Sequence, residues 1–475
     1  MESGQKNGWH LFQHLFQLQA VALAILGATV ASAQQADLGM RFNFSTPGAR
    51  SLAMGGAFIG LADDATAAYT NPAGLSNLMV GGPEVAIEAR SWRLYNRNPV
   101  GGNDTGAPTG FGIDTVAGTA YGTSAVDTRG ISFLSLGYVL PSGWTAALYR
   151  HEPVHFLNQY VNQGIFHTSS VQQPCWTPET PGNDQPLCRE FPYRLNLRAL
   201  VENYGVSVAH EILEPFGRSG EALSVGLGLS YYRFHSQARA DFFLYDRDHD
   251  PLLNRLPGFL FGPADLLESS KLATASVDGT DSGVGINAGL LWKIGREGRW
   301  SLGAVYRQGA GFKVAGRATD ALGHPLPAPE SNVTSSLRLP DSWGVGAAYS
   351  LGRGETKLTL DLDQIRYSQR RSELPPRERA SAQIDDGNEV HLGMERVVPI
   401  AESLIATLRL GGWYESAHEL RQTSAGAPGA GGSSGGSYHW SGGLGLVVKE
   451  DYQIDVAADI AAGAHTLSLS LLRFL

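Results

Sequence analysis

The sequence predicts an all-β fold: a transmembrane antiparallel β-barrel of about 14 strands, with an N-terminal hatch segment that plugs the lumen. Three observations predict this fold: a period-two alternation of apolar and polar residues, a strict alternation of short and long connections, and an unusual composition. Of 475 residues, 59 are glycine and only 17% are charged, against ~25% charged residues in soluble domains. The composition therefore argues against the roughly three soluble domains that length alone suggests.

The first 33 residues are predicted to be a signal peptide. Lys6 opens a short polar region, residues 18–30 form an uncharged apolar stretch, and Ala31-Ser32-Ala33 supplies the small residues of a cleavage site. A transmembrane anchor is the alternative, but the stretch is shorter than the ~20 residues that cross a bilayer. An exported chain can keep disulfides, and we expect Cys175 and Cys188 to form one across a Pro-rich segment.

Beyond about residue 80 the chain shows the alternation typical of strands with two different faces. Apolar residues alternate with Gly, Ser or Asn over 223–231 and 284–292. Over 358–362 and 454–460 the intervening residues include aspartates, whose carboxylates need water. A soluble β-sandwich is the alternative. However, many predicted strands have one face of Leu, Val, Tyr and Trp with few charges, and such faces suit contact with lipid better than burial between two sheets.

The connections decide the topology. In an up-and-down outer-membrane barrel, every strand reverses the chain, so short turns lie on the periplasmic side and long loops lie outside. Short connections are found at 141–143, 215–220, 295–298, 352–354, 399–402 and 449–451. Long segments separate them at 94–128, 153–191, 245–280, 318–332, 370–384 and 418–437. The fourteen strands are expected at 83–93, 129–140, 143–152, 193–211, 221–244, 281–294, 299–317, 333–350, 355–369, 385–398, 403–417, 437–448, 452–460 and 464–474.

The segment 34–80, between the signal peptide and the barrel at 81–475, is rich in Ala and Gly. Helix-start and turn signals at Asp63-Asp64 and Asn71-Pro72 predict short helices with tight turns. The lumen of a fourteen-stranded barrel is too wide for wall side chains alone to fill. This segment is therefore expected to be a plug, with a periplasmic cap as the alternative.

The run 48–75, which ends in Asn71-Pro72-Ala73-Gly74-Leu75, resembles the N-terminal hatch of the FadL-type outer-membrane transport proteins. Parts of the last third of the chain also resemble that family, namely 339–346, 360–368, 389–395 and 408–414, whereas 94–128 and 153–191 do not. The hatch residues that carry the resemblance include Gly55, Gly56, Asp63, Asp64, Asn71, Pro72, Ala73 and Gly74.

The resemblance implies a plugged barrel in the bacterial outer membrane. It further implies diffusive uptake of long-chain fatty acids or other hydrophobic small molecules, gated by the plug, without catalysis or a cofactor. Related barrels with the same hatch pattern serve protein secretion to the cell surface, and such a secretion shuttle is the alternative function. The expected partners are the hydrophobic compound and outer-membrane lipids, with the protein as a monomer.

Two long segments contain apolar residues that an aqueous loop does not need. Over 156–166 the spacing predicts an amphipathic helix, and the second segment, 252–267, is similarly apolar. The two segments together are expected to form an outer capture groove, since apolar patches mark binding or packing. Packing of loop on loop is the alternative. The residues expected in the groove are Phe156, Leu157, Tyr160, Val161, Leu256, Phe259 and Leu260.

Strand parity predicts which charged residues face the lumen. They are Arg198, Glu202, Arg307, Asp361, Asp363, His391, Glu395, Arg409, Asp455 and Asp459. Paired charges there are expected to hold plug and wall together. Arg307 and Arg409 are also the candidates for binding a ligand carboxylate, because a guanidinium binds carboxylate in bidentate fashion.

The remaining motifs argue against an enzyme and against nucleic acid as a partner. The net charge of −9 leaves no basic surface to neutralise phosphates. The run 151–155 matches the zinc motif H-E-x-x-H, which requires both histidines on one face of a helix. Pro153 in its centre breaks such a helix, so no metal site and no catalytic residues are predicted.

Overall fold

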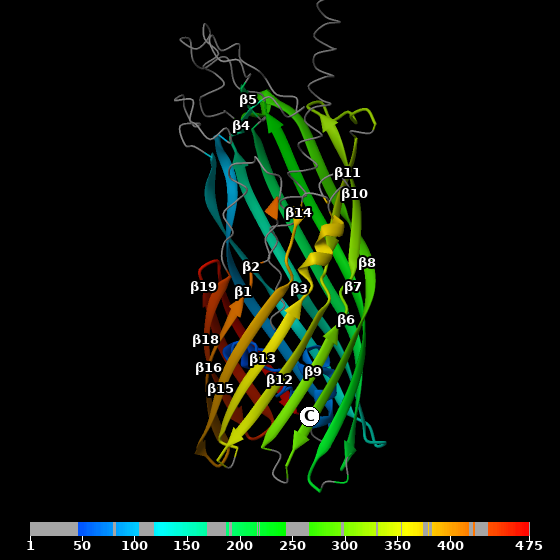
Figure 1. The fold of residues 1–475 in the computed structure, drawn as a ribbon, viewed down its shortest axis with the longest axis vertical. Helices are drawn as coiled ribbons and strands as arrows, with labels where there is room; N and C mark the ends of the chain where they lie inside the picture. Colours follow the sequence, from blue (N-terminus) through cyan, green and yellow to red (C-terminus); the bar gives the residue numbers. More distant parts are fainter. Residues whose placement is uncertain are drawn as a thin grey trace, which may run out of the picture.

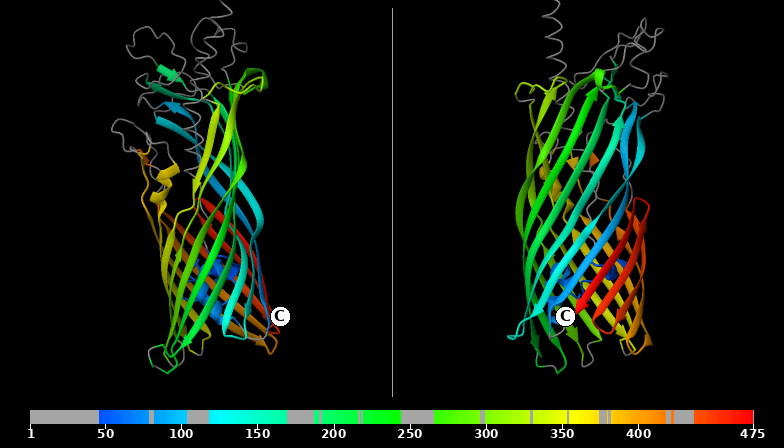
Figure 2. Two further views of the ribbon diagram at one scale, coloured as in Figure 1. Left: turned by 90° about the vertical axis from the view of Figure 1, so that its right-hand side faces the viewer. Right: turned by 180° about the vertical axis from the view of Figure 1, so that it is seen from behind.

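The structure, a computed structural model, places most of the chain in a closed β-barrel (Figures 1 and 2). It describes residues 46–78, 82–103, 118–168, 187–189, 192–215, 217, 219–243, 266–295, 299–328, 331–352, 354–373, 379, 382–417, 421–422 and 436–474. The predicted signal peptide lies outside the described residues. None of the helices in these ranges has both the length and the apolar composition of a helical membrane span.

The wall consists of fourteen antiparallel staves, as the alternation of connections predicts. A stave here is one strand, or two collinear strands, that crosses the wall once. Two staves are each interrupted once, so that β9 continues as β10 and β11 continues as β12. Pairing of β1 with β20, from Glu84↔Phe474 to Leu94↔Ala464, closes the barrel. The wall strands are β1 (Glu84–Asn103), β2 (Gly118–Val139), β3 (Trp144–Asn162), β6 (Tyr193–Leu213), β7 (Ala222–Phe243), β8 (Lys271–Ile294), β9 (Trp300–Arg307), β10 (Gly311–Asp320), β11 (Asn332–Arg338), β12 (Ser342–Leu351), β13 (Thr356–Ile365), β15 (Gly387–Ala401), β16 (Leu404–Glu415), β18 (Ser437–Val448), β19 (Tyr452–Ala461) and β20 (Ala464–Phe474).

Smaller elements lie outside the staves. Among the described residues, three short helices precede the barrel, and the remaining pieces belong to the long connections. These elements are α2 (Ala49–Ala53), α3 (Ala67–Thr70), η1 (Pro72–Asn77), β4 (Ile165–Thr168), β5 (Leu187–Arg189), η5 (Glu268–Ser270), η6 (Tyr367–Glu373), β14 (Ala382–Gln383) and β17 (Arg421–Gln422).

The predicted amphipathic helix over 156–166 is wrong, because residues 156–162 form the upper half of β3. Phe156 pairs with Ala199 of β6 and Tyr160 pairs with Leu195. Residues four apart share a face in a strand as they do in a helix, so the apolar spacing is compatible with both structures. Pairing with β6 selects the strand. Strands β1, β2 and β8 also reach further into the predicted loops than the alternation alone indicates.

The outer face of the short-turn half of the barrel is apolar. Most of its exposed large side chains are apolar, as lipid hydrocarbon requires. Among them are Leu148, Leu227, Leu229, Val284, Ile286, Leu290, Leu410, Leu444, Val456 and Leu467.

The polarity of the wall reverses in the upper half, above the apolar band. On β6, Leu195 and Leu197 are buried toward the lumen while Arg198 between Leu197 and Ala199 is exposed. Glu202 has the same parity as Arg198 and pairs with Arg150 at 2.7 Å. The predicted lumenal positions of Arg198 and Glu202 are therefore wrong, because the prediction assumed that apolar residues face outward along the whole strand.

The wall also has a seam. Within the described residues, β2 pairs with β3 only over Phe133–Val139 and 145–151, and above this level β2 pairs with β1 while β3 pairs with β6. A bulge between His151 and Val154 marks the start of the seam. Side chains of β1 cover it: Trp92 lies edge-on to His155, with ring centroids 6.2 Å apart, and the Asn98 amide donates to Asn158 at 3.2 Å.

The change from an apolar to a polar outer face predicts that the free-energy cost of an outward charge depends on its position along the barrel axis. Leu229→Arg, within the apolar band of β7, is expected to reduce the free energy of unfolding by about 2–4 kcal/mol if it lies near the bilayer midplane. Gln237→Arg, on the same face above the band, is expected to change it by less than about 0.5 kcal/mol. Denaturant unfolding in lipid vesicles measures both. Equal losses would contradict the assigned boundary between bilayer and water.

Candidate functional site

The hatch, defined here as residues 46–78, lies inside the barrel near the end with the short turns (Figure 1). Helix α2 packs against β16, β18, β19 and β20, and η1 packs against β6, β7 and β8. Nearly all of its residues are buried. The segment therefore bridges opposite sides of the lumen and blocks the lower half of the barrel.

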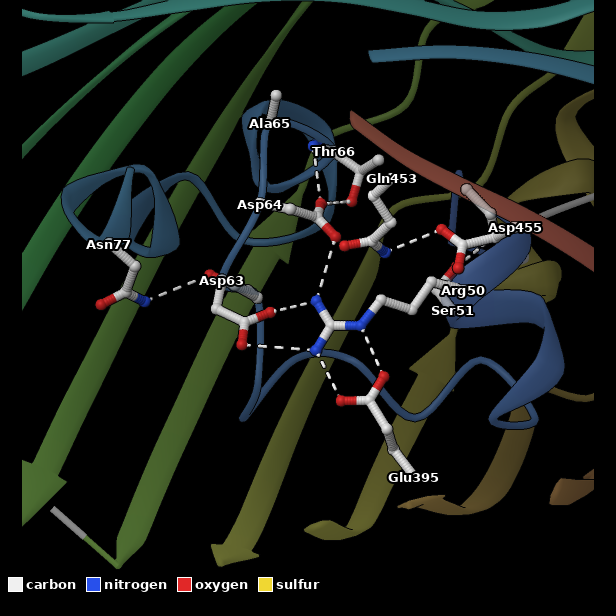
Figure 3. A network of polar contacts seen from close by, with 12 residues as sticks. Arg50, Ser51, Asp63, Asp64, Ala65, Thr66, Asn77, Glu395, Gln453 and Asp455 are labelled. Atoms are coloured by element: carbon white, nitrogen blue, oxygen red, sulfur yellow. Dashed lines mark hydrogen bonds and ion pairs between the residues drawn. The ribbon is translucent and has the colours of Figure 1, made fainter. Parts of the chain in front are cut away.

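Arg50 of α2 is the centre of the first contact between hatch and wall (Figure 3). Its guanidinium is buried, donates to Asp63 at 2.5 Å and Asp64 at 3.3 Å within the hatch, and donates to Glu395 of β15 at 2.8 Å. Lys357 of β13 adds a second cation, 2.9 Å from Asp63. Because these groups are paired, loss of any one partner would leave a buried charge without compensation and would destabilise the seated hatch.

The network continues along the lumenal face of the wall through Arg409 of β16. Its guanidinium donates to Glu395 at 2.7 Å and to Asp455 of β19 at 2.6 Å. Gln453 in turn donates to Asp455 at 2.8 Å (Figure 3). The predicted lumenal positions of Glu395, Arg409 and Asp455 therefore agree with the structure, and these side chains join plug to wall.

The acidic residues of the hatch respond to Arg50 differently. Burial opposes ionisation of Asp63, but the positive charges of Arg50 and Lys357 outweigh it and lower its pKa to about 2. Burial raises the pKa of Asp64, since its contact with Arg50 is longer. The acidic partners raise the pKa of Arg50 against the effect of burial. Asp63 and Arg50 thus form the fixed charge pair of the hatch.

The second contact is formed by the Asn-Pro turn on the opposite wall. Asn71 donates to the carbonyls of Ile59 at 2.9 Å and Leu290 at 3.1 Å, and accepts from the N–H of Ala73 at 3.2 Å. Arg307 donates to the carbonyls of Tyr69 and Thr70, which end α3. The cation therefore lies where a helix leaves unpaired carbonyl groups.

Glycines let the hatch approach the wall backbone closely. Gly55 has a φ of +67°, and a Cβ there would lie 2.7 Å from backbone atoms of Leu392 and Gly412. A Cβ on Gly411 of the wall would overlap the backbone of Met54 and Gly55. Neither position accepts a side chain while the hatch is seated.

The structure separates the sequence-predicted ligand residues. Phe156 and Tyr160 belong to the lumenal face of β3, whereas Leu157 and Val161 have the opposite parity and are partly exposed. Arg307 and Arg409 face the lumen but are engaged as described above, so a role in binding a ligand carboxylate stays a prediction. Leu256, Phe259 and Leu260 lie outside the described residues, as does Cys175, the predicted disulfide partner of Cys188.

Above the hatch, an apolar lining covers the inner wall. Its residues are buried and come from β3, β6, β7, β8, β10 and β11. They include Val154, Phe156, Leu195, Leu197, Val201, Phe234, Phe242, Val277, Phe312, Val314, Val333 and Leu337. Most of them were missed from the sequence, although the alternation of Leu195 and Leu197 with Arg194 and Arg198 is the signal that could have found them.

Two arginines near this lining have acidic partners. Arg370 of η6 is fully buried, and its guanidinium Nε lies 3.3 Å from Glu373. Arg90, at the level of the hatch, donates to Glu88 and to the Thr46 carbonyl at 2.7 Å. Within the described ranges, no group of three or more His, Cys, Asp or Glu side chains is arranged to hold a metal ion. The lining therefore suits an uncharged, apolar molecule.

Comparisons with known proteins support the fold. No protein-family model matches the chain, and a search of curated protein sequences gives no match. Among solved structures, the chain is similar to a FadL homologue of Pseudomonas aeruginosa, with a TM-score of 0.54 and 15% identity over 91% of this chain and 99% of that chain. It is also similar to the monoaromatic hydrocarbon channel CymD, with a TM-score of 0.52 and 14% identity over 92% of this chain and 99% of that chain. The toluene transporter TbuX of Ralstonia pickettii gives a TM-score of 0.52 and 14% identity over 91% of this chain and 99% of that chain. The chain thus has the fold of the FadL-type channels, as the hatch resemblance implies.

Removing the central cation is expected to loosen the hatch. Arg50→Met leaves Asp63 and Glu395 buried without their main partner, a loss of about 3–5 kcal/mol for a buried pair. Hydrogen exchange of the hatch amides is therefore expected to rise strongly while the wall stays protected. Arg396→Met is the matched control, because Arg396 pairs with Glu355 at the exposed surface and such pairs contribute little. Unchanged exchange in Arg50→Met would contradict the role of this network.

Acid is expected to release the hatch through Asp63. A carboxyl whose pKa is lowered by folding stabilises the folded state above its ordinary pKa of 3.8 and loses this effect as the pH falls toward about 2. The contribution of Asp63 to hatch protection is therefore expected to be constant from neutral pH to about pH 4 and to fall between about 4 and 2. Hydrogen exchange measured across this range tests the expectation, and Asp63→Asn is expected to flatten the step. A step of the same size in Asp63→Asn would exclude Asp63 as its source.

Proposed function

We propose that the protein is an outer-membrane channel for diffusive uptake of uncharged hydrophobic small molecules. The observation that carries the proposal is the apolar lining of the upper lumen, in the part of the barrel whose outer face is polar. Neither lipid contact nor solubility in water requires apolar residues there, and sites for small molecules are lined predominantly by hydrophobic and aromatic side chains. The hydrocarbon channels that share the fold support this choice of substrate class.

The arrangement of hatch and seam suggests the route. A molecule that enters from the long-loop side passes along the apolar lining until it meets the hatch, which blocks the lower lumen. The seam between β2 and β3 begins near this level and is bridged there by side chains of β1 instead of ladder hydrogen bonds. Movement of those side chains would let a hydrophobic molecule leave the lumen sideways, at the upper border of the apolar band, without unseating the hatch.

Uptake by vesicles or cells that contain the protein tests the proposal. Labelled toluene is expected to enter faster than in vesicles without the protein, and faster than the carboxylate palmitate, because the lining offers no unpaired cation among the described residues. Equal rates with and without the protein would contradict a channel. Transfer of an exported protein to the cell surface, without hydrocarbon uptake, would favour the secretion shuttle.

A pair of neighbouring substitutions separates the lining from the fold. Leu197→Asn removes a leucine from the lumen, a loss of about 1.5–3 kcal/mol of apolar contact, and is expected to reduce toluene uptake about tenfold. Arg198→Asn changes the adjacent residue on the outer face and is expected to leave uptake unchanged. Initial uptake rates, normalised to folded barrel, are the measurement. The same loss in both variants would mean that the lumen does not carry the molecule.

A further inference from the structure

A groove of about 510 Å³ crosses the outer face of the barrel, over β3, β6, β7, β8, β9 and β12. Its floor includes the small side chains of Ala288 and Ala304, and its rim includes the larger side chains of Trp144, Leu227 and Trp343. Outward-facing residues of the apolar band form its walls, so the groove opens toward the bilayer. It is distinct from the lumen and from the seam between β2 and β3.

The groove exists because side chains are small on both faces of the wall at this point. Gly226 and Gly289 pair across β7 and β8, and both take inward positions against the hatch. A Cβ on Gly226 would overlap Pro72 and Ala73. At this glycine pair the wall is therefore no thicker than its backbone, with the Asn-Pro turn of the hatch directly behind it.

The shape of the groove fits an extended chain. It spans six adjacent strands, and at ~4.8 Å between neighbours this gives a length of roughly 24 Å. Its lining is almost entirely apolar, and it is continuous with the apolar band that faces lipid. Water gains nothing by filling such a hollow, whereas a flexible hydrocarbon chain from the adjoining bilayer recovers contact along its length.

The two ends of the groove carry polar groups beside aromatic rings. Trp144 stacks on His210, with ring centroids 4.7 Å apart, close to a short turn. At the other end, the indole N–H of Trp343 donates to Gln364 at 2.9 Å. Aromatic side chains with one polar edge favour the boundary between hydrocarbon and headgroups. This arrangement suits a lipid, which has an apolar chain and a polar head.

We propose that the groove is a binding site for one acyl chain of an outer-membrane phospholipid. The site lies on the bilayer side of the wall that seats the hatch, and it does not depend on which molecule the lumen carries. A bound acyl chain fills the hollow that the small residues leave, so the site holds lipid more tightly than the rest of the band.

Native mass spectrometry of the detergent-extracted protein with added dipalmitoyl phosphatidylethanolamine tests the proposal. The wild-type chain is expected to retain one phospholipid under conditions that strip the others. Ala288→Leu with Ala304→Leu fills the floor and is expected to reduce the retained fraction at least about tenfold, the effect of ~1.4 kcal/mol. Ala406→Leu, an outward position on β16 away from the groove, is the matched control and is expected to retain the lipid.

A second measurement keeps the test independent of retention in detergent. In vesicles with a small fraction of phospholipid brominated on its acyl chains, Trp144 and Trp343 are expected to be quenched more than the bulk lipid composition predicts. The loss of quenching in Trp144→Phe with Trp343→Phe assigns the signal. Quenching equal to the bulk value, or retention that is equal in the groove-filled variant and its control, would overturn the proposal. Dimers that disappear when the groove is filled would show instead that a second copy occupies it.

Discussion

The structure depends on a simple constraint: each residue of a stave faces either the lumen or the outside, and neighbours alternate. The environment outside changes along the stave, from hydrocarbon in the lower half to water in the upper half. On β6 the exposed residues are accordingly Val206 and Val208 below and Arg198 above. Once the upper outer face is polar, the alternating apolar residues of the same strand must line the lumen. The apolar lining and the bilayer band are thus two consequences of one pattern.

The lower lumen meets a different requirement. There the inner face is polar, and its carboxylates and amides need partners that an apolar ligand cannot give. The hatch provides them, with Arg50 for Glu395 and with backbone carbonyls for Asn287 and Arg307. Buried charges are stable only when paired, so the hatch completes the lower half while the upper half stays apolar. This division explains why one barrel holds both an ionic network and a hydrocarbon-like surface.

The sequence predicts the features that rest on local signals. Short turns such as 141–143 alternate with long connections, and counting the segments between them predicts fourteen staves. Parity also predicts the lumenal side of Glu395, Arg409 and Asp455, since these residues lie in the lower half, where apolar residues do face outward. The prediction fails for Arg198 and for the upper part of β3 because the height of the bilayer boundary and the partner strand are not local properties. The contact of Arg307 with α3 depends on the seated hatch, which strand periodicity does not encode.

The central claim is that hydrophobic molecules occupy the upper lumen. A crystal structure of the protein soaked with bromotoluene tests it most directly, because anomalous scattering locates the bromine. A bromine site is expected within contact distance of the lining formed by Phe234, Phe312 and Val314. Bromine sites confined to the outer face of the barrel, with none in the upper lumen, would contradict it.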